Sequence, residues 1–159
     1  MSKQMKGQLV YKTVQSITLP AQLEAWTRVR TCPQEVLDPT AEFLAVRGRV
    51  EGRRLKVVGE VLIQGTLVLT NGRLWALKMA SSFGLEFSLS ELVQTGHMVI
   101  EPQVVGLTYS INQLGRKQAE VKFIIPSTFA VKVMAVQPCE VAALLAHCHF
   151  RPAFLPVVV

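Results

Sequence analysis

The stretch Gly65-Thr-Leu-Val-Leu-Thr-Asn-Gly-Arg-Leu-Trp-Ala-Leu77 predicts a β-hairpin, and it decides the fold class of the chain. Two apolar runs flank Asn71-Gly72, a pair that tolerates the positive φ angles of a type I′ turn. A two-residue loop would place Leu69 opposite Leu74 and Val68 opposite Trp75. The predicted faces are Leu67, Leu69, Leu74 and Ala76 on one side, and Val68, Trp75 and Leu77 on the other. Both faces are apolar, so we expect the hairpin to lie inside a sheet with protein on both sides.

Most of the chain after Ala41 has the pattern of short β-strands. Glycine, proline and serine clusters separate the apolar runs, among them Glu51-Gly52, Ser81-Ser-Phe-Gly84 and Pro126-Ser127. The predicted strands are 42–50, 53–64, 66–70, 73–80, 85–92, 104–111, 119–125 and 128–136. Strands at this spacing predict a mainly β fold, a barrel or sandwich of consecutive antiparallel hairpins.

The N-terminal part predicts a strand, a helix and a linker. Residues 8–19 alternate imperfectly and predict a strand. Residues 21–30 predict a short helix, since Leu23 and Trp26 recur at helical spacing and Pro20 suits the first helical turn. The segment 33–40, with two prolines and an aspartate, predicts a linker.

The C-terminal part predicts an amphipathic helix over 137–150, followed by an apolar tail. Pro138 suits the first helical position, and the Glu140 carboxylate complements the helix dipole. The apolar stripe consists of Val141, Leu144, Leu145 and Cys148. We therefore divide the chain into an N-terminal strand–helix extension (1–37), a β domain (38–150) and an apolar tail (151–159).

Composition and charge restrict the class of protein. Half of the 159 residues are hydrophobic and only 18% are charged, which argues against disorder. The net charge of +6 permits attraction to nucleic acid or anionic lipid. No apolar run reaches the roughly 20 residues of a membrane span, and no secretion signal is recognisable. Cys32, Cys139 and Cys148 have no paired spacing, so we expect free thiols and a cytoplasmic location, with peripheral membrane association as an alternative.

The hairpin sequence resembles a known family. Gly65-Thr-Leu-Val-Leu-Thr-Asn-Gly-Arg-Leu-Trp75 is similar to the signature of GRAM and bacterial PH-like domains, and 85–92 and 137–150 stand in the expected order. The resemblance covers residues 38–150. It implies a PH-like fold, in which a bent antiparallel sheet forms a partly open barrel or sandwich and a C-terminal amphipathic helix caps one end.

The segment 47–56 is the first candidate binding site. Its five cations are Arg47, Arg49, Arg53, Arg54 and Lys56. On a hairpin they would gather near one tip, where guanidinium groups could hold phosphate by paired hydrogen bonds. The alternative is an edge hairpin whose charges keep the sheet soluble and prevent edge-to-edge pairing.

Catalytic and metal-binding signatures are not recognisable in the sequence. His147-Cys-His149 contains good zinc ligands, but on an intact helix the three side chains point in different directions. The carboxylates are scattered singly, and the sequence contains no P-loop, dinucleotide-binding or H-E-x-x-H motif. We therefore expect no catalytic residues, no metal and no cofactor.

The leading functional hypothesis is a non-catalytic, PH-like, protein-binding or self-associating adaptor. Its expected contact residues lie in the apolar tail: Phe154, Leu155, Val157 and Val158. The alternative is binding to anionic phospholipid through the basic segment 47–56, with nucleic acid as a further partner of the same segment.

Overall fold

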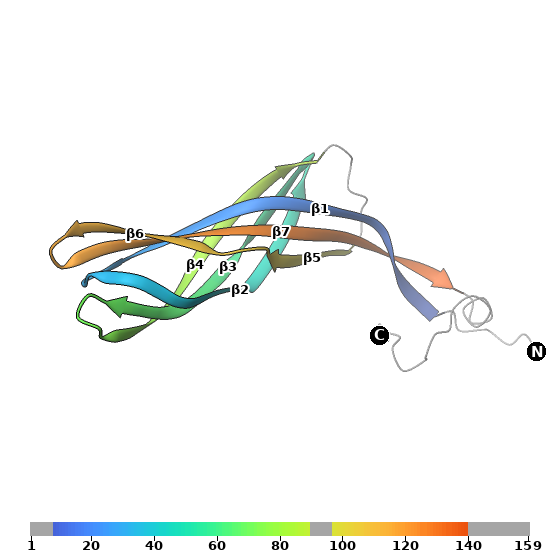
Figure 1. Ribbon diagram of the computed structural model, residues 1–159. Coiled ribbons are helices and arrows are strands. Elements are labelled where there is room, and N and C mark those ends of the chain that lie inside the picture. Colours follow the sequence, from blue (N-terminus) through green and yellow to red (C-terminus); the bar gives the residue numbers. More distant parts are fainter. Residues whose placement is uncertain (1–7, 90–96, 140–159) are drawn as a thin grey trace, which may run out of the picture.

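The computed structural model describes residues 8–89 and 97–139, with side chains over 13–89 and 97–134, and every element in these ranges is a β-strand (Figure 1). The strands are β1 (Gln8–Val29), β2 (Pro33–Glu51), β3 (Arg54–Leu69), β4 (Leu74–Ser88), β5 (His97–Val104), β6 (Thr108–Gly115) and β7 (Gln118–Cys139). All of their pairings are antiparallel. The predicted mainly β, antiparallel fold class is therefore confirmed.

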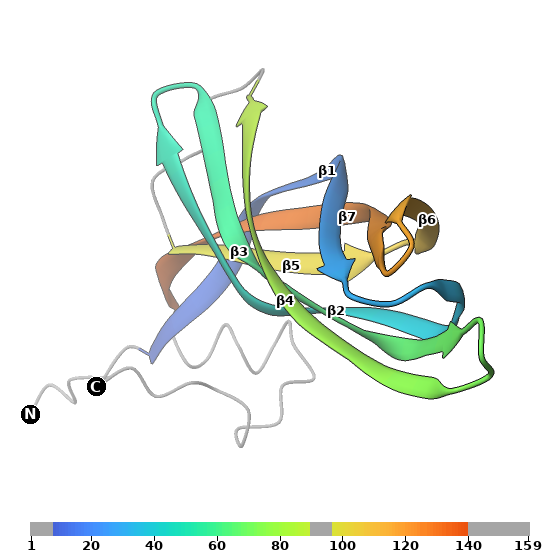
Figure 2. The same cartoon turned by 90° about the vertical axis from the view of Figure 1, so that its left-hand side faces the viewer.

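The strands divide between two sheets, which do not close into a barrel within the described ranges. In the larger sheet β7 is central: β1 pairs along one side of it, and β5 and β6 follow one another along the other side. The smaller sheet has the order β2-β3-β4 and crosses the larger one (Figure 2). Consecutive hairpins were correctly predicted for β2-β3-β4 and β6-β7, but β1 pairs with the last strand rather than with β2.

The hydrophobic core fills the space between the two sheets. Every second residue of β3, β4 and β7 faces inward, and β7 contributes the odd-numbered residues from Ala119 to Val133, all of them buried. At the centre Phe129 is fully buried, with ring centroids 5.5 Å from Phe43 and 6.0 Å from Phe83. The phenylalanine rings therefore join the two layers.

The β3–β4 hairpin forms, but its predicted turn and register are wrong. Only Gly72 has a positive φ (80°) in this turn, which excludes type I′. The Gly72 amide donates to the Leu69 carbonyl (2.9 Å) and the Leu69 amide to the Arg73 carbonyl (2.9 Å), so the loop has three residues and ends in a glycine bulge. The Asn71 side-chain oxygen also accepts a hydrogen bond from the Arg73 amide (3.0 Å), which further stabilises the turn.

The extra loop residue shifts the hairpin by one position. Leu67 is paired with Trp75 and Val68 with Leu74. A slip of one residue exchanges the faces of a strand, so Leu77 is buried with Leu67 and Leu74 is 63% exposed. The expectation that both faces of the hairpin meet protein is not met, because Leu74 points outward to solvent.

The predicted helix 21–30 is wrong, because residues 21–29 continue β1. Leu23 and Ala25 point into the core, while Trp26 points outward and is 61% exposed. Period-two alternation thus prevails over the helical spacing of Leu23 and Trp26. Pro20 fits the strand because the larger sheet pairs with β1 on one side only, and edge positions tolerate proline.

The Pro126-Ser127 pair does not end β7, contrary to expectation. The Pro126 carbonyl accepts from the amides of Val105 (2.8 Å) and Gly106 (3.3 Å). Because the amide and carbonyl of one strand residue point to the same side, the nitrogen of Pro126 faces the gap between β5 and β6. A central strand can therefore contain proline where no ladder hydrogen bond is required.

Other predicted boundaries are also corrected. The proposed linker 33–40 is the first part of β2, where Asp38 adopts a positive φ (46°) next to a bulge. The strand 97–104 was not predicted. β7 includes Gln137 to Cys139, the first residues of the predicted helix. The rest of that helix and the tail 151–159 lie outside the described residues, and the three-part division of the chain stays a prediction.

Truncation of the central ring tests this core. We expect Phe129→Ala to lower the free energy of unfolding by about 3–5 kcal/mol, because it removes a fully buried ring that joins both sheets. Trp26→Ala removes a large ring that is 61% exposed and should change it by about 0.5 kcal/mol. Urea denaturation followed by circular dichroism measures both, and equal effects would contradict the observed core.

Candidate functional site

The basic segment 47–56 forms the tip of the β2–β3 hairpin, as predicted. Arg49 pairs with Lys56 and Glu51 with Arg54, which leaves Gly52-Arg53 as a two-residue turn. Gly52 has a positive φ (63°), as the first central position of a type II′ turn requires. The structure thus brings all five predicted cations to one end of the smaller sheet.

Two carboxylates neutralise much of this charge. The Lys56 ammonium lies 2.9 Å from one oxygen of Glu51, and the Arg49 guanidinium lies 3.3 Å from the other. Arg54 donates to Glu86 on the neighbouring strand β4 at 2.7 Å. Three of the five cations therefore have an ion-pair partner. For these three, the arrangement favours the alternative interpretation, in which the charges of an edge hairpin face solvent and do not bind a ligand.

The Glu51–Lys56 pair also shifts the proton equilibria of both groups. The hydrogen bond from Lys56, with its positive charge and that of Arg49, lowers the pKa of the Glu51 carboxyl below 4.5. The same hydrogen bond raises the pKa of Lys56 above 10.5. Both pKa shifts favour the charged forms near neutral pH, so the pair is not poised for proton transfer.

Arg47 and Arg53 make no ion pair with any residue that the structure describes. Arg47 borders an open depression of about 300 Å³ on the smaller sheet, together with Val58 and Glu60. An arginine and a glutamate on the same depression give it no net charge. The anion-binding candidate therefore reduces to two cations, Arg47 beside this depression and Arg53 in the β2–β3 turn.

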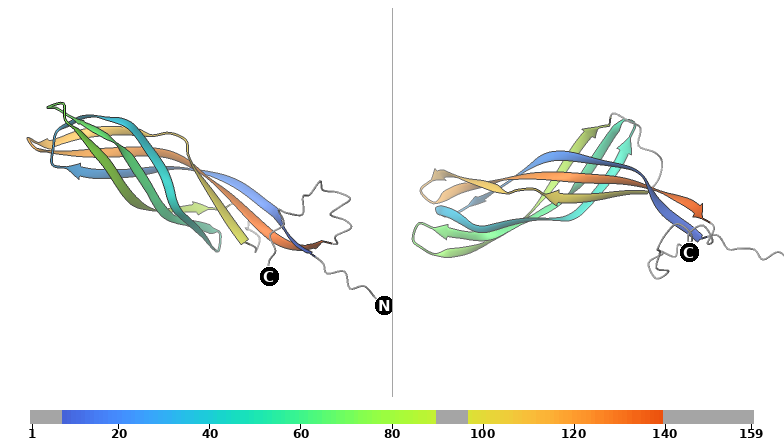
Figure 3. Two further views of the ribbon diagram at one scale, coloured as in Figure 1. Left: turned by 90° about the horizontal axis from the view of Figure 1, so that it is seen from below. Right: turned by 45° about the vertical axis from the view of Figure 1, so that its right-hand side comes forward.

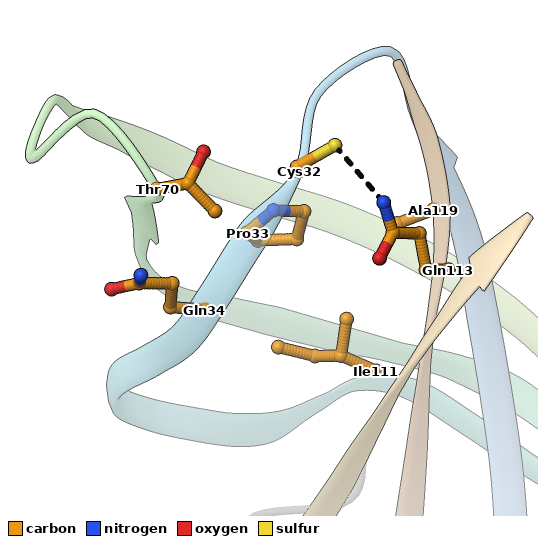
Figure 4. A pocket seen from close by; sticks show the side chains of 7 residues that line it. All are labelled: Cys32, Pro33, Gln34, Thr70, Ile111, Gln113 and Ala119. Carbon is orange, nitrogen blue, oxygen red and sulfur yellow. Dashed lines mark hydrogen bonds between the residues drawn. The ribbon is translucent and has the colours of Figure 1, made fainter. Parts of the chain in front are cut away.

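A second cavity, of about 460 Å³, lies at the opposite end of the sandwich (Figure 4). The Cys32 thiol donates to the Arg116 carbonyl (3.0 Å), and the Gln113 amide donates to Cys32 Sγ (3.7 Å). The Thr70 amide donates to the Cys32 carbonyl (3.1 Å). These contacts tie the β1–β2, β3–β4 and β6–β7 turns together, and the Cys32-Pro33 sequence alone did not indicate this.

The lining of this cavity does not point to catalysis. Its residues are neutral: Cys32, Pro33, Gln34, Thr70, Ile111, Gln113 and Ala119. Within residues 13–89 and 97–134, no three His, Cys, Asp or Glu side chains are grouped so that they could hold a metal ion. His147, Cys148, His149 and the predicted contact residues Phe154, Leu155, Val157 and Val158 lie outside the described residues.

The free side of β4 is the third candidate, and sequence reasoning missed it. β4 pairs with β3 on one side only (Figure 3), and no described strand forms a ladder with its second side, although β1 comes close to β4. At its start Leu74 is 63% and Trp75 47% exposed, and Leu37 on the same sheet is 40% exposed. An open strand edge next to exposed apolar side chains is a surface suited to another polypeptide.

Comparisons of the chain with protein-family models, with curated proteins and with solved structures give no match. No helix in the described ranges is long and apolar enough to span a membrane. We therefore infer the function from the surfaces of the structure.

Removal of the Lys56 ammonium tests the hairpin electrostatics. We expect Lys56→Gln to raise the pKa of Glu51 toward 4.5, because it removes the hydrogen bond and the charge that lower it. Lys117→Gln removes an exposed cation from the β6–β7 turn and should leave Glu51 unchanged. The pKa is read from the carboxyl chemical shift in an NMR pH titration.

The sign of the pH effect follows from the direction of this shift. A lowered carboxyl pKa stabilises the fold above the unfolded-state pKa, and this contribution is lost as the pH falls through the folded-state pKa. An unchanged Glu51 pKa in Lys56→Gln would show that the ion pair does not form in solution.

Proposed function

We propose that this chain is a non-catalytic module that binds another polypeptide on its smaller sheet. The observation that supports it is the open edge of β4 next to Leu74 and Trp75, which are 63% and 47% exposed. Exposed backbone groups along a strand can pair with an incoming strand, and neighbouring apolar side chains then add buried area. This combination needs no reacting group.

The relationship to PH-like and GRAM domains is part of the proposal. It is supported by the seven antiparallel strands within residues 8–89 and 97–139 and by the hairpin that 65–77 forms, the stretch that resembles the family signature. The capping helix of that family would fall on residues outside the described ranges.

Site-specific photo-crosslinking tests the proposed binding surface. A photoreactive phenylalanine analogue at position 74 should cross-link to a polypeptide in the source cell, because Leu74 lies on the proposed surface. The matched control is position 105, where Val105 is equally exposed at 64% but lies between β5 and β6. Absence of a cross-link at position 74, or equal products at both positions, would refute the proposed function.

A second candidate function is peripheral binding to anionic phospholipid through the β2–β3 tip. It is favoured by Arg47 and Arg53, the two cations of the tip without an ion-pair partner among the described residues. Basic side chains near an anionic membrane each add a favourable contribution of about 1 kcal/mol. Nucleic acid could use the same two cations, and its binding would weaken steeply with salt.

Vesicle sedimentation tests the second candidate. The double variant Arg47→Glu with Arg53→Glu should lose binding to phosphatidylserine vesicles, because it reverses both unpaired cations. Arg30→Glu with Lys117→Glu makes the same change in net charge at the opposite end of the sandwich and should retain binding. Equal binding by the parent and both variants, or no binding by the parent, would exclude this candidate.

A further inference from the structure

We infer that the polypeptide bound by β4 is a second copy of this chain, whose own β4 pairs with it antiparallel about a twofold axis at Ser82. This inference rests on the proposed function, since it names the partner for the same surface. The two smaller sheets would then join into one continuous sheet. Such an interface is isologous, because each copy presents the same strand to the other.

The free side of β4 has the backbone geometry that an incoming strand requires. The Arg73 carbonyl accepts from Leu69 of β3, and the Leu89 amide donates to the carbonyl of Arg53, the residue before β3, so the backbone groups of the odd-numbered residues of β4 face β3. Because the sides alternate along a strand, the amides and carbonyls of even-numbered residues from Ala76 to Ser88 face the open edge. The register of β4 on β3 is unbroken by any bulge, so this row is continuous.

Other edges of the fold carry features that discourage pairing, whereas β4 does not. β1 contains Pro20 and a bulge between Thr13 and Gln15, and β2 has three register shifts. Prolines and bulges are the usual means of protecting an edge strand. β4 contains neither, and Lys78 and Glu86 are its only charged residues.

The two charges of β4 select the partner and the register. In an antiparallel pair centred on Ser82, Lys78 of each copy lies opposite Glu86 of the other. Both residues are on the outward face, where they are exposed. The registers centred on Lys78 or on Glu86 place like charges opposite each other, which is destabilising. Lys78 makes no ion pair among the described residues, so its charge is available to a partner.

The inward face of β4 is complementary in the same register. Leu77 lies opposite Phe87 of the second copy, and Met79 lies opposite Leu85. Met79, Leu85 and Phe87 are only partly buried in the single chain, because they border the open side of the sandwich. Cross-strand apolar neighbours would cover them. Charge on the outer face and apolar area on the inner face thus specify the same pairing.

Sedimentation velocity on the full chain, combined with charge reversal, tests this pairing. We expect the parent to form a species of twice the chain mass of 17.6 kDa. Lys78→Glu and Glu86→Lys each turn both attractive contacts into repulsive ones, so each should raise the dissociation constant about tenfold or more. An equimolar mixture of the two variants restores opposite charges at both positions and should form a heterodimer with an affinity near that of the parent.

Two further variants keep the test decisive. Ser82→Pro removes a backbone amide that faces the open edge and should abolish the dimer. This variant is needed because Glu86→Lys loses the hydrogen bond from Arg54 and could fail to fold. Lys117→Glu, in the β6–β7 turn, should leave the dimer unchanged. Circular dichroism confirms folding of each variant.

Several results would overturn the inference. They are a parent that sediments as a single chain at all concentrations, a dimer that persists in both Lys78→Glu and Ser82→Pro, or equal weakening by Lys117→Glu. If the parent protein is a monomer and cross-links from position 74 to a different protein, the inferred dimer is wrong but the proposed function still holds. A missing cross-link at position 74 would instead overturn the proposed function.

Discussion

Strand β7 lies in the middle of the larger sheet, and the rest of the fold depends on its pairing along both sides. β1 fills one side over the whole length of β7, while β5 and β6 fill the other side in succession. The junction between β5 and β6 coincides with Pro126, where β7 has no amide to donate on that side. The inward row of β7, with Phe123 and Phe129 fully buried, then supplies the larger sheet's main contribution to the core.

The smaller sheet carries the surfaces that can bind a partner. The core covers one of its faces, so charges and the exposed apolar residue Leu74 lie on the other. At the β2–β3 end, Glu51 and Glu86 pair with three of the five cations, which leaves a weaker anion-binding surface than the sequence suggested. On β4 a continuous backbone edge remains unpaired among the described strands. This contrast is the reason that we favour a polypeptide partner over an anionic surface.

The sequence predicted local features well and distant pairings poorly. The position of the basic segment 47–56 at the tip of one hairpin was correct, because a hairpin turn is encoded within its own short segment. The neutralisation of Arg54 was missed, since Glu86 comes from a strand 32 residues away. The register at Asn71-Gly72 was wrong by one residue because type I′ and bulged turns use similar residues. The helix predicted for 21–30 failed because pairing with β7 outweighs a weak helical spacing.

Alternating apolar residues and glycine turns are encoded within short segments, so the sequence was enough to predict that the chain is built mainly from antiparallel strands. Three features could be learned only from the complete fold: the first strand pairs with the last, a central strand contains Pro126, and β4 has no strand paired on its second side within the described residues. Each of these depends on which segments meet across long distances in the chain. That choice is made by the free energy of burying both sheets together, and no short segment contains it.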